Sequence, residues 1–130
     1  MLEMLPTAVP RVAKEDLQQR LNGSRGEPPV IVDVRLKYPY EHSTVKLPGA
    51  IRMAPGALDA SALPRDREIV VYDSDPDELV SERVAAELIR LGYRASALRG
   101  GIAEWVNAKL PIETKPAPQA APPAPGALKG

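Results

Sequence analysis

The run from Glu68 to Tyr72, Glu-Ile-Val-Val-Tyr, decides the fold, and it ends at Asp73. Its three consecutive β-branched residues, without a polar residue between them, predict a strand that other elements cover on both faces. A second run of this kind extends from Val30 to Val34 and predicts a second buried strand. Strands covered on both faces are typical of parallel sheets, which need helices in their connections.

Helical patterns alternate with these strands. Apolar side chains with helical spacing occur in three segments, residues 13–21, 80–91 and 102–108. Shorter extended segments are expected at residues 9–12, 50–53 and 95–98, with one or two helical turns within 56–63. The last helix is expected to bury Ile102, Trp105 and Val106. This alternation predicts an α/β fold, a small and mostly parallel sheet with helices on both faces.

The charge balance and hydropathy of the chain exclude several classes of partner. Its 17 basic and 17 acidic side chains cancel, so no long-range attraction to nucleic acid or to an anionic membrane is expected. No apolar stretch reaches the roughly 20 residues that cross a bilayer. The first ten residues lack the basic and apolar regions of a secretory signal. We therefore expect a cytoplasmic protein with neither nucleic acid nor a membrane as a partner.

The chain contains no cysteine and a single histidine, His42. The absence of thiols excludes disulfides, cysteine-ligated metal sites and every reaction that needs a thiol. The C-terminal stretch is rich in proline and alanine, a composition typical of an extended chain that does not pack. We expect a folded domain over residues 1–114 and a disordered tail over residues 115–130.

Several short motifs follow one another along the folded part. Asp33-Val34-Arg35 ends the first buried run, Pro48-Gly49-Ala50 precedes a short strand, and Gly100-Gly101 precedes Trp105. Over residues 8–112 these motifs, in this order, resemble a rhodanese-like domain. The resemblance implies a sulfurtransferase whose cysteine carries the transferred sulfur as a persulfide. It also implies a loop, Cys-x-x-Gly-x-Arg-Ser, whose backbone N–H groups stabilise the anion together with the N-terminus of the next helix.

The chain departs from this pattern at the reacting residue. Asp73 stands where the resemblance expects the catalytic cysteine, and no glycine follows within the loop. The loop is about three residues longer than usual, nearly one helical turn. The resemblance therefore implies no catalytic residue and no cofactor here. The residues expected to line the pocket are Asp73, Ser74, Asp75, Asp77, Glu78, Ser81 and Arg35.

Without the resemblance, the segment after Asp73 is typical of a helix start. Asp75 is the expected N-cap, Pro76 the first helical residue and Glu78 the acid that completes a capping box. We hypothesise that the loop has partly become a self-capped helix, whose carboxylates would repel thiosulfate and phosphate. For Asp33 we prefer a structural role, in which the buried carboxylate accepts backbone N–H bonds.

Chemical alternatives remain for the acidic segment. A hydrophobic strand followed by Asp73 and Asp75 resembles phosphoryl-transfer enzymes of the haloacid dehalogenase type, which use Mg²⁺ with one aspartate as the nucleophile. The acids from Asp73 to Glu78 could also bind Ca²⁺ or Mg²⁺ weakly, although the glycine of a calcium loop is missing. A family member with another reaction is a further alternative.

We expect a non-catalytic binding or regulatory module rather than an enzyme, with no metal site. An acidic pocket favours a protein surface or peptide that carries positive charge. The sequence does not determine the oligomeric state or the partner.

Overall fold

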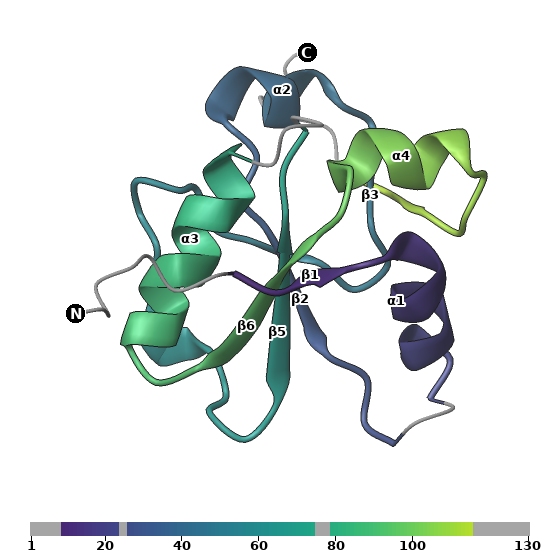
Figure 1. The fold of residues 1–130 in the computed structure, drawn as a ribbon. Helices are drawn as coiled ribbons and strands as arrows, with labels where there is room; N and C mark the ends of the chain where they lie inside the picture. The colour runs from purple at the N-terminus through teal and green to yellow at the C-terminus, as the bar shows by residue number, and fades with distance from the viewer. Residues whose placement is uncertain (1–8, 24–25, 75–78, 116–130) are drawn as a thin grey trace, which may run out of the picture.

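Five parallel strands form the central sheet of the computed structural model, in the order β1-β6-β5-β2-β4 (Figure 1). The structure describes residues 9–23, 26–74 and 79–115. The strands, in sheet order, are β1 (Arg11–Val12), β6 (Arg94–Leu98), β5 (Glu68–Tyr72), β2 (Val30–Asp33) and β4 (Ile51–Arg52). The run that we expected to be buried, β5, is therefore the middle strand, and the predicted parallel sheet is confirmed.

Helices cover both faces of this sheet, as predicted. Helix α3 (Leu79–Arg90) lies on one face, and α1 (Lys14–Leu21) and α4 (Gly101–Asn107) lie on the other (Figure 1). A short helix, α2 (Lys37–His42), lies at the end of the sheet where the parallel strands finish. The helical turns expected within 56–63 are one short 3₁₀ helix (Ala60–Ala62).

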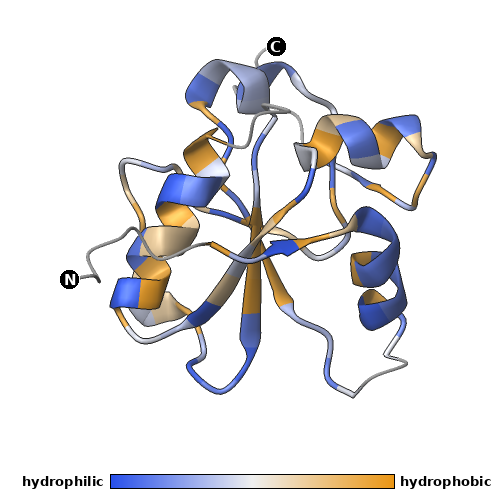
Figure 2. Cartoon of the chain, in the orientation of Figure 1, coloured by the Kyte–Doolittle hydropathy of each residue, from blue (hydrophilic) through white to orange (hydrophobic). Residues whose placement is uncertain are grey.

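The two faces of β5 explain its unbroken apolar sequence. Ile69 and Val71 pack in the cluster under α3, whereas Val70 and Tyr72 pack in the cluster under α1 and α4. Each of these side chains is fully buried, which stabilises the fold by about 1.5–3 kcal/mol per large apolar side chain. Figure 2 shows the same division, with apolar residues at the centre of the sheet and polar residues on the outer faces of α1 and α3.

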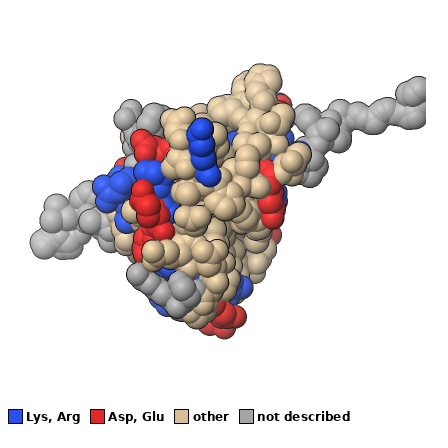
Figure 3. Space-filling view, turned by 90° about the vertical axis from the view of Figure 1, so that its right-hand side faces the viewer, with Lys and Arg blue, Asp and Glu red and all other residues tan. Residues whose placement is uncertain are grey.

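Charged side chains of both signs lie next to one another along one edge of the α1–α4 side, and much of the remaining surface on this side is uncharged (Figure 3). An ion pair connects α1 with α4, because Lys14 Nζ lies 3.3 Å from Glu104 Oε1. The interspersed signs match the zero net charge of the chain.

Two features of the fold were not predicted. Helix α2 contains Pro39 as its third residue, a position where the missing N–H has no intrahelical acceptor in any case. A two-stranded antiparallel sheet pairs β3 (Val45–Lys46) with β7 (Glu113–Thr114). Strands of two residues are too short for an alternating pattern, so only the approach of distant segments reveals them.

The prediction that α4 buries Val106 is wrong. Ile102 and Trp105 are buried, but Val106 is 41% exposed. The indole Nε1 of Trp105 donates a hydrogen bond to the Pro111 carbonyl at 2.7 Å. This bond and the burial of the indole orient the helix with Val106 on its outer side.

The described chain ends at Lys115, whose N–H donates to the Thr44 carbonyl at 2.8 Å. The predicted tail otherwise falls on residues 116–130, which lie outside the described residues. Among the helices that the structure describes, none is both long enough and apolar enough to span a bilayer.

Adjacent substitutions on α4 test this orientation. We expect Trp105→Ala to lower the free energy of unfolding by about 3–5 kcal/mol, because it leaves a large cavity. Val106→Ala, the matched control, should change it by less than about 1 kcal/mol, because the side chain is largely in solvent. Urea unfolding followed by circular dichroism measures both values, and equal losses would contradict the orientation of α4.

Candidate functional site

Asp73 lies at the end of the middle strand, between the N-terminal turns of two helices. Its side chain is buried, with only 1% of the residue exposed. The carboxylate Oδ2 accepts a hydrogen bond from the backbone N–H of Ser81 at 2.7 Å, at the start of α3. The backbone carbonyl of Asp73 accepts a second bond, from the N–H of Ile102 at 2.9 Å, at the start of α4. One residue therefore connects β5 to both helices.

The close approach of α4 to Asp73 requires glycine at position 101. A Cβ atom on Gly101 would lie 2.4 Å from the carbonyl oxygen of Asp73, and the φ angle of Gly101 is +64°. Both the space and the left-handed backbone exclude a larger residue. The Gly100-Gly101 pair thus allows the chain to return from β6 directly onto the end of β5.

The structure brings together some of the residues predicted to line the pocket. Asp73 and Ser81 are both buried and in contact, and Ser74 follows Asp73 in a partly exposed position. Asp75, Asp77 and Glu78 lie outside the described residues, as does the predicted capping box. The sequence pattern did not reveal the bond from Ser81 to Asp73, because a cap was expected at Asp75.

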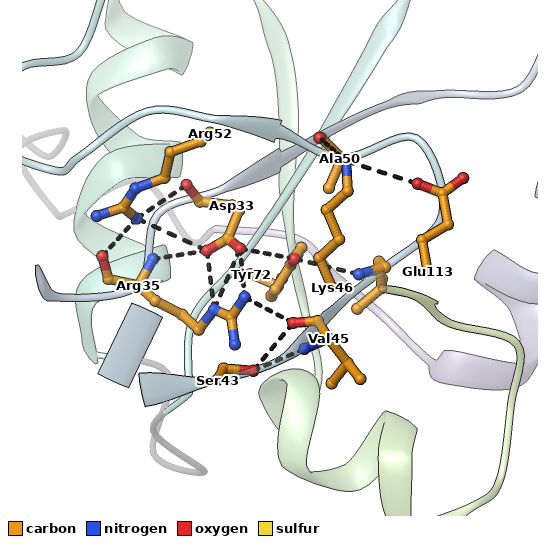
Figure 4. A network of polar contacts seen from close by, with 10 residues as sticks. Asp33, Arg35, Ser43, Val45, Lys46, Ala50, Arg52, Tyr72 and Glu113 are labelled. Carbon is orange, nitrogen blue, oxygen red and sulfur yellow. Dashed lines mark hydrogen bonds and ion pairs between the residues drawn. The ribbon is translucent and has the colours of Figure 1, made fainter. Parts of the chain in front are cut away.

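Arg35 belongs to a separate buried cluster around Asp33 (Figure 4). Its Nε and Nη2 atoms donate to the Asp33 carboxylate, Nε at 3.0 Å to Oδ1 and Nη2 at 2.7 Å to Oδ2. The backbone N–H of Arg35 also donates to Asp33 Oδ1 at 3.1 Å. The expected burial of the Asp33 carboxylate and its bond from a backbone N–H are confirmed.

Tyr72 extends this cluster from β2 to the loop before β4. Its hydroxyl donates to Asp33 Oδ2 at 2.9 Å and accepts a bond from the N–H of Leu47 at 3.2 Å. Arg35 Nη2 donates to the Val45 carbonyl at 3.1 Å. Three segments that are distant in the sequence therefore meet around one carboxylate (Figure 4).

Three cations surround the ring of Tyr40 on α2. The Arg52 guanidinium carbon lies 4.0 Å from the ring centroid, Lys115 Nζ 4.3 Å and the Arg35 guanidinium carbon 5.3 Å. Arg52 Nη1 also donates to the Arg35 carbonyl at 2.6 Å. Cation–π contacts of this kind each contribute about 0.5–2 kcal/mol, so they hold α2 against the ends of β2 and β4.

Both Arg35 and Tyr72 in this cluster have a raised pKa. Burial alone would lower the pKa of Arg35, but its hydrogen bonds to Asp33 and the negative charge of that carboxylate outweigh burial, and the pKa is raised. Burial, followed by the charge of Asp33, raises the pKa of the Tyr72 hydroxyl far above its usual range. Tyr72 therefore acts as a hydrogen-bond donor at neutral pH and not as a base.

Comparison with known proteins identifies the family. The model of the rhodanese-like domain matches residues 13–108, so the chain belongs to the rhodanese-like family, and the resemblance found in the sequence is confirmed. The chain is also 32% identical over 99 residues to a tRNA sulfurtransferase from Desulfurococcus amylolyticus. That match covers 76% of this chain but 19% of the relative, so the chain spans about a fifth of the relative's length.

Solved structures share the fold of this chain. A protein from Lactobacillus plantarum is 26% identical, with a TM-score of 0.70, over 81% of this chain and 88% of that one. A rhodanese-like domain protein from Staphylococcus aureus has a TM-score of 0.67 over 82% of this chain and 98% of that one. Its sequence identity is 18%, so this second likeness shows the shared fold alone.

The raised pKa of Tyr72 predicts a loss of stability in alkaline solution. In the unfolded chain Tyr72 loses its proton near pH 10, whereas in the folded protein it keeps it. The unfolded state then binds fewer protons, so the free energy of unfolding falls as the pH rises above about 10, by at most about 1.4 kcal/mol per pH unit. Urea unfolding at pH 7.0–10.5 measures this slope.

Two variants distinguish the contribution of Tyr72 to this slope from that of the other groups that lose protons in alkaline solution. Tyr72→Phe should be about 1–3 kcal/mol less stable at neutral pH, because Leu47 and Asp33 lose a partner, and its alkaline slope should be shallower. Tyr38→Phe, at a position 65% exposed, should keep the full slope. Identical slopes in both variants would show that Tyr72 does not retain its proton.

Proposed function

We propose that this rhodanese-like domain is a non-catalytic binding or regulatory module without sulfurtransferase activity. The observation that carries the proposal is the buried Asp73 carboxylate and its bond from Ser81. In the family a cysteine at the corresponding strand end accepts sulfur and becomes a persulfide. A carboxylate forms no persulfide, and no cysteine elsewhere in the 130 residues can replace it.

The carboxylate also competes with any free anion. A helix N-terminus attracts negative charge through its unpaired N–H groups and its dipole. In this chain Asp73 supplies that charge from within the protein, because its Oδ2 already accepts the Ser81 N–H. Thiosulfate would have to displace a covalently attached anion and enter beside three more acids in the sequence, Asp75, Asp77 and Glu78.

The alternative of phosphoryl transfer has less support. A nucleophilic aspartate must reach its substrate, whereas Asp73 is only 1% exposed and its Oδ2 accepts a backbone hydrogen bond. Asp75, the expected acid or base, lies outside the described residues.

The partner that fits this module is a protein surface or peptide with positive charge. The acids between Asp73 and Leu79 carry most of the negative charge near the end of β5 in the sequence, and opposite charges give orientation and faster association. The balanced charge of the chain does not favour contact with tRNA. A cytoplasmic location is part of this proposal and rests on the sequence alone.

A sulfurtransferase assay tests the absence of catalysis. With thiosulfate and cyanide, the wild-type protein should form no thiocyanate above the uncatalysed background. Asp73→Cys should gain at most a trace of activity, because a side chain at this position is buried and the acidic residues remain. Thiocyanate formation is measured by the colour of its iron complex.

Circular dichroism and thermal unfolding of Asp73→Cys must show a folded protein for this result to count. Asp73→Asn, which keeps the shape and removes the charge, serves as the matched control and should also be inactive. Robust turnover by the wild type would refute the proposal. Strong activity of Asp73→Cys would show that the loop still accepts an anion.

Binding of a basic peptide tests the module itself. We expect a fluorescein-labelled peptide that alternates lysine and leucine to bind the wild type, and added salt to weaken the binding by screening. The triple variant Asp75→Lys, Asp77→Lys, Glu78→Lys should lose it. A control with the same change of net charge, Glu15→Lys, Glu87→Lys, Glu113→Lys, should retain most of it, because these acids lie outside the acidic segment, on α1, in the last turns of α3 and on β7.

Fluorescence anisotropy measures the dissociation constants of all three proteins. Equal weakening in both triple variants would attribute binding to net charge alone, and no binding by the wild type would reject a basic partner.

A further inference from the structure

Among the described residues, the edge strand β1 pairs only with the C-terminal part of β6, at Ala97 and Leu98. The N–H of Ala97 donates to the Pro10 carbonyl at 2.9 Å, and the N–H of Arg99 donates to the Val12 carbonyl at 2.9 Å. Because backbone groups of alternate residues point to the same side of a strand, the N–H and C=O of Ala95 also point toward the β1 side. Pro10, the residue before β1, has no N–H to offer to the Ala95 carbonyl.

The N–H and C=O of Ala95, a residue that is only 5% exposed, face the edge of the sheet beyond the N-terminal end of β1. In the described part of the chain, no bond connects either group to a neighbour on the β1 side. Unpaired edge groups of this kind are templates for another strand. Because β1 is only two residues long, its pairing with β6 does not reach Ala95.

A cavity of about 670 Å³ lies beside this edge. Ala95 lines it, together with apolar side chains that include Val12, Ile89 and Tyr93. Ser96, only 8% exposed, also lines it from the neighbouring position on β6. The volume is that of a ligand or peptide pocket, and the lining combines apolar contact area with unpaired polar groups.

Arginines dominate the charge around this cavity. Four arginines line it against two acids, Asp16 and Glu68. Arg11 pairs with Glu82 at 3.0 Å, and Arg20 pairs with Glu68. Arg94 and Arg99, at the two ends of β6, are exposed and have no carboxylate partner among residues 9–23, 26–74 and 79–115. The cavity therefore carries a surplus of positive charge next to this edge.

We propose that this cavity binds an extended, acidic peptide segment of a partner protein. One peptide residue exchanges backbone hydrogen bonds with the N–H and C=O of Ala95, as in the addition of a strand to a sheet. Carboxylates on either side of that residue pair with Arg94 and Arg99, and the side chains between them fill the apolar part. This site is separate from Asp73 and goes beyond the function proposed above.

A labelled heptapeptide that alternates valine and glutamate tests the proposal with the full chain. We expect saturable binding by fluorescence anisotropy, and in ¹⁵N NMR spectra a shift of the Ala95 amide with slower hydrogen exchange. Arg94→Ala and Arg99→Ala should each weaken binding about two- to fivefold, as for an exposed ion pair. Arg83→Ala on α3, an exposed arginine away from this cavity, is the matched control and should leave binding unchanged.

Two altered peptides and one further measurement make the test decisive. A peptide that is N-methylated at its central residue should lose binding, because it cannot donate to Ala95. Equal affinity for a valine–lysine peptide, or shifts at Ser81 and Ile102 instead of Ala95, would overturn the proposal. So would an Ala95 amide that is already protected in the free chain, with no peptide binding, since another segment or a second copy would then cover the edge. Sedimentation velocity separates these last two cases.

Discussion

The bonds that Asp73 makes to the starts of two helices hold the carboxyl end of the sheet together. Its carboxylate accepts the N–H of Ser81 and its carbonyl accepts the N–H of Ile102. A hydrogen bond to a charged group contributes about 1.5–3 kcal/mol, and a buried carboxylate without one would cost more. The group that accepts the Ser81 N–H at the start of α3 is therefore a carboxylate of the chain itself.

A second buried carboxylate has a comparable role at the end of β2. Asp33 binds Arg35 with both oxygens and accepts the Tyr72 hydroxyl. Because Tyr72 and Asp73 are consecutive, the two carboxylate clusters share the end of β5. In both clusters, carboxylate oxygens accept hydrogen bonds from within the protein, as buried polar groups generally do.

The two binding proposals concern different parts of the chain. The acidic residues that follow Asp73 in the sequence offer charge without a reactive group. At β6, a proline precedes a two-residue strand, and backbone groups of Ala95 beside a cavity have no partner on that side within residues 9–23, 26–74 and 79–115. Fold and reaction are separable properties, so a domain of this family that lacks the thiol can still have a surface that binds partners.

The sequence by itself determined the buried strands, the parallel α/β architecture and the absence of thiol chemistry, because these depend on local patterns and on composition. The alternation of Ile69 and Val71 with Val70 and Tyr72 follows from the two faces of a strand. Only the tertiary structure decided which groups hold the two carboxylates. Tyr72 and Asp33 are 39 residues apart, and the two-residue strands β3 and β7 meet across the length of the domain. Contacts between such distant segments depend on how the whole chain packs, and no local pattern of residues encodes that packing.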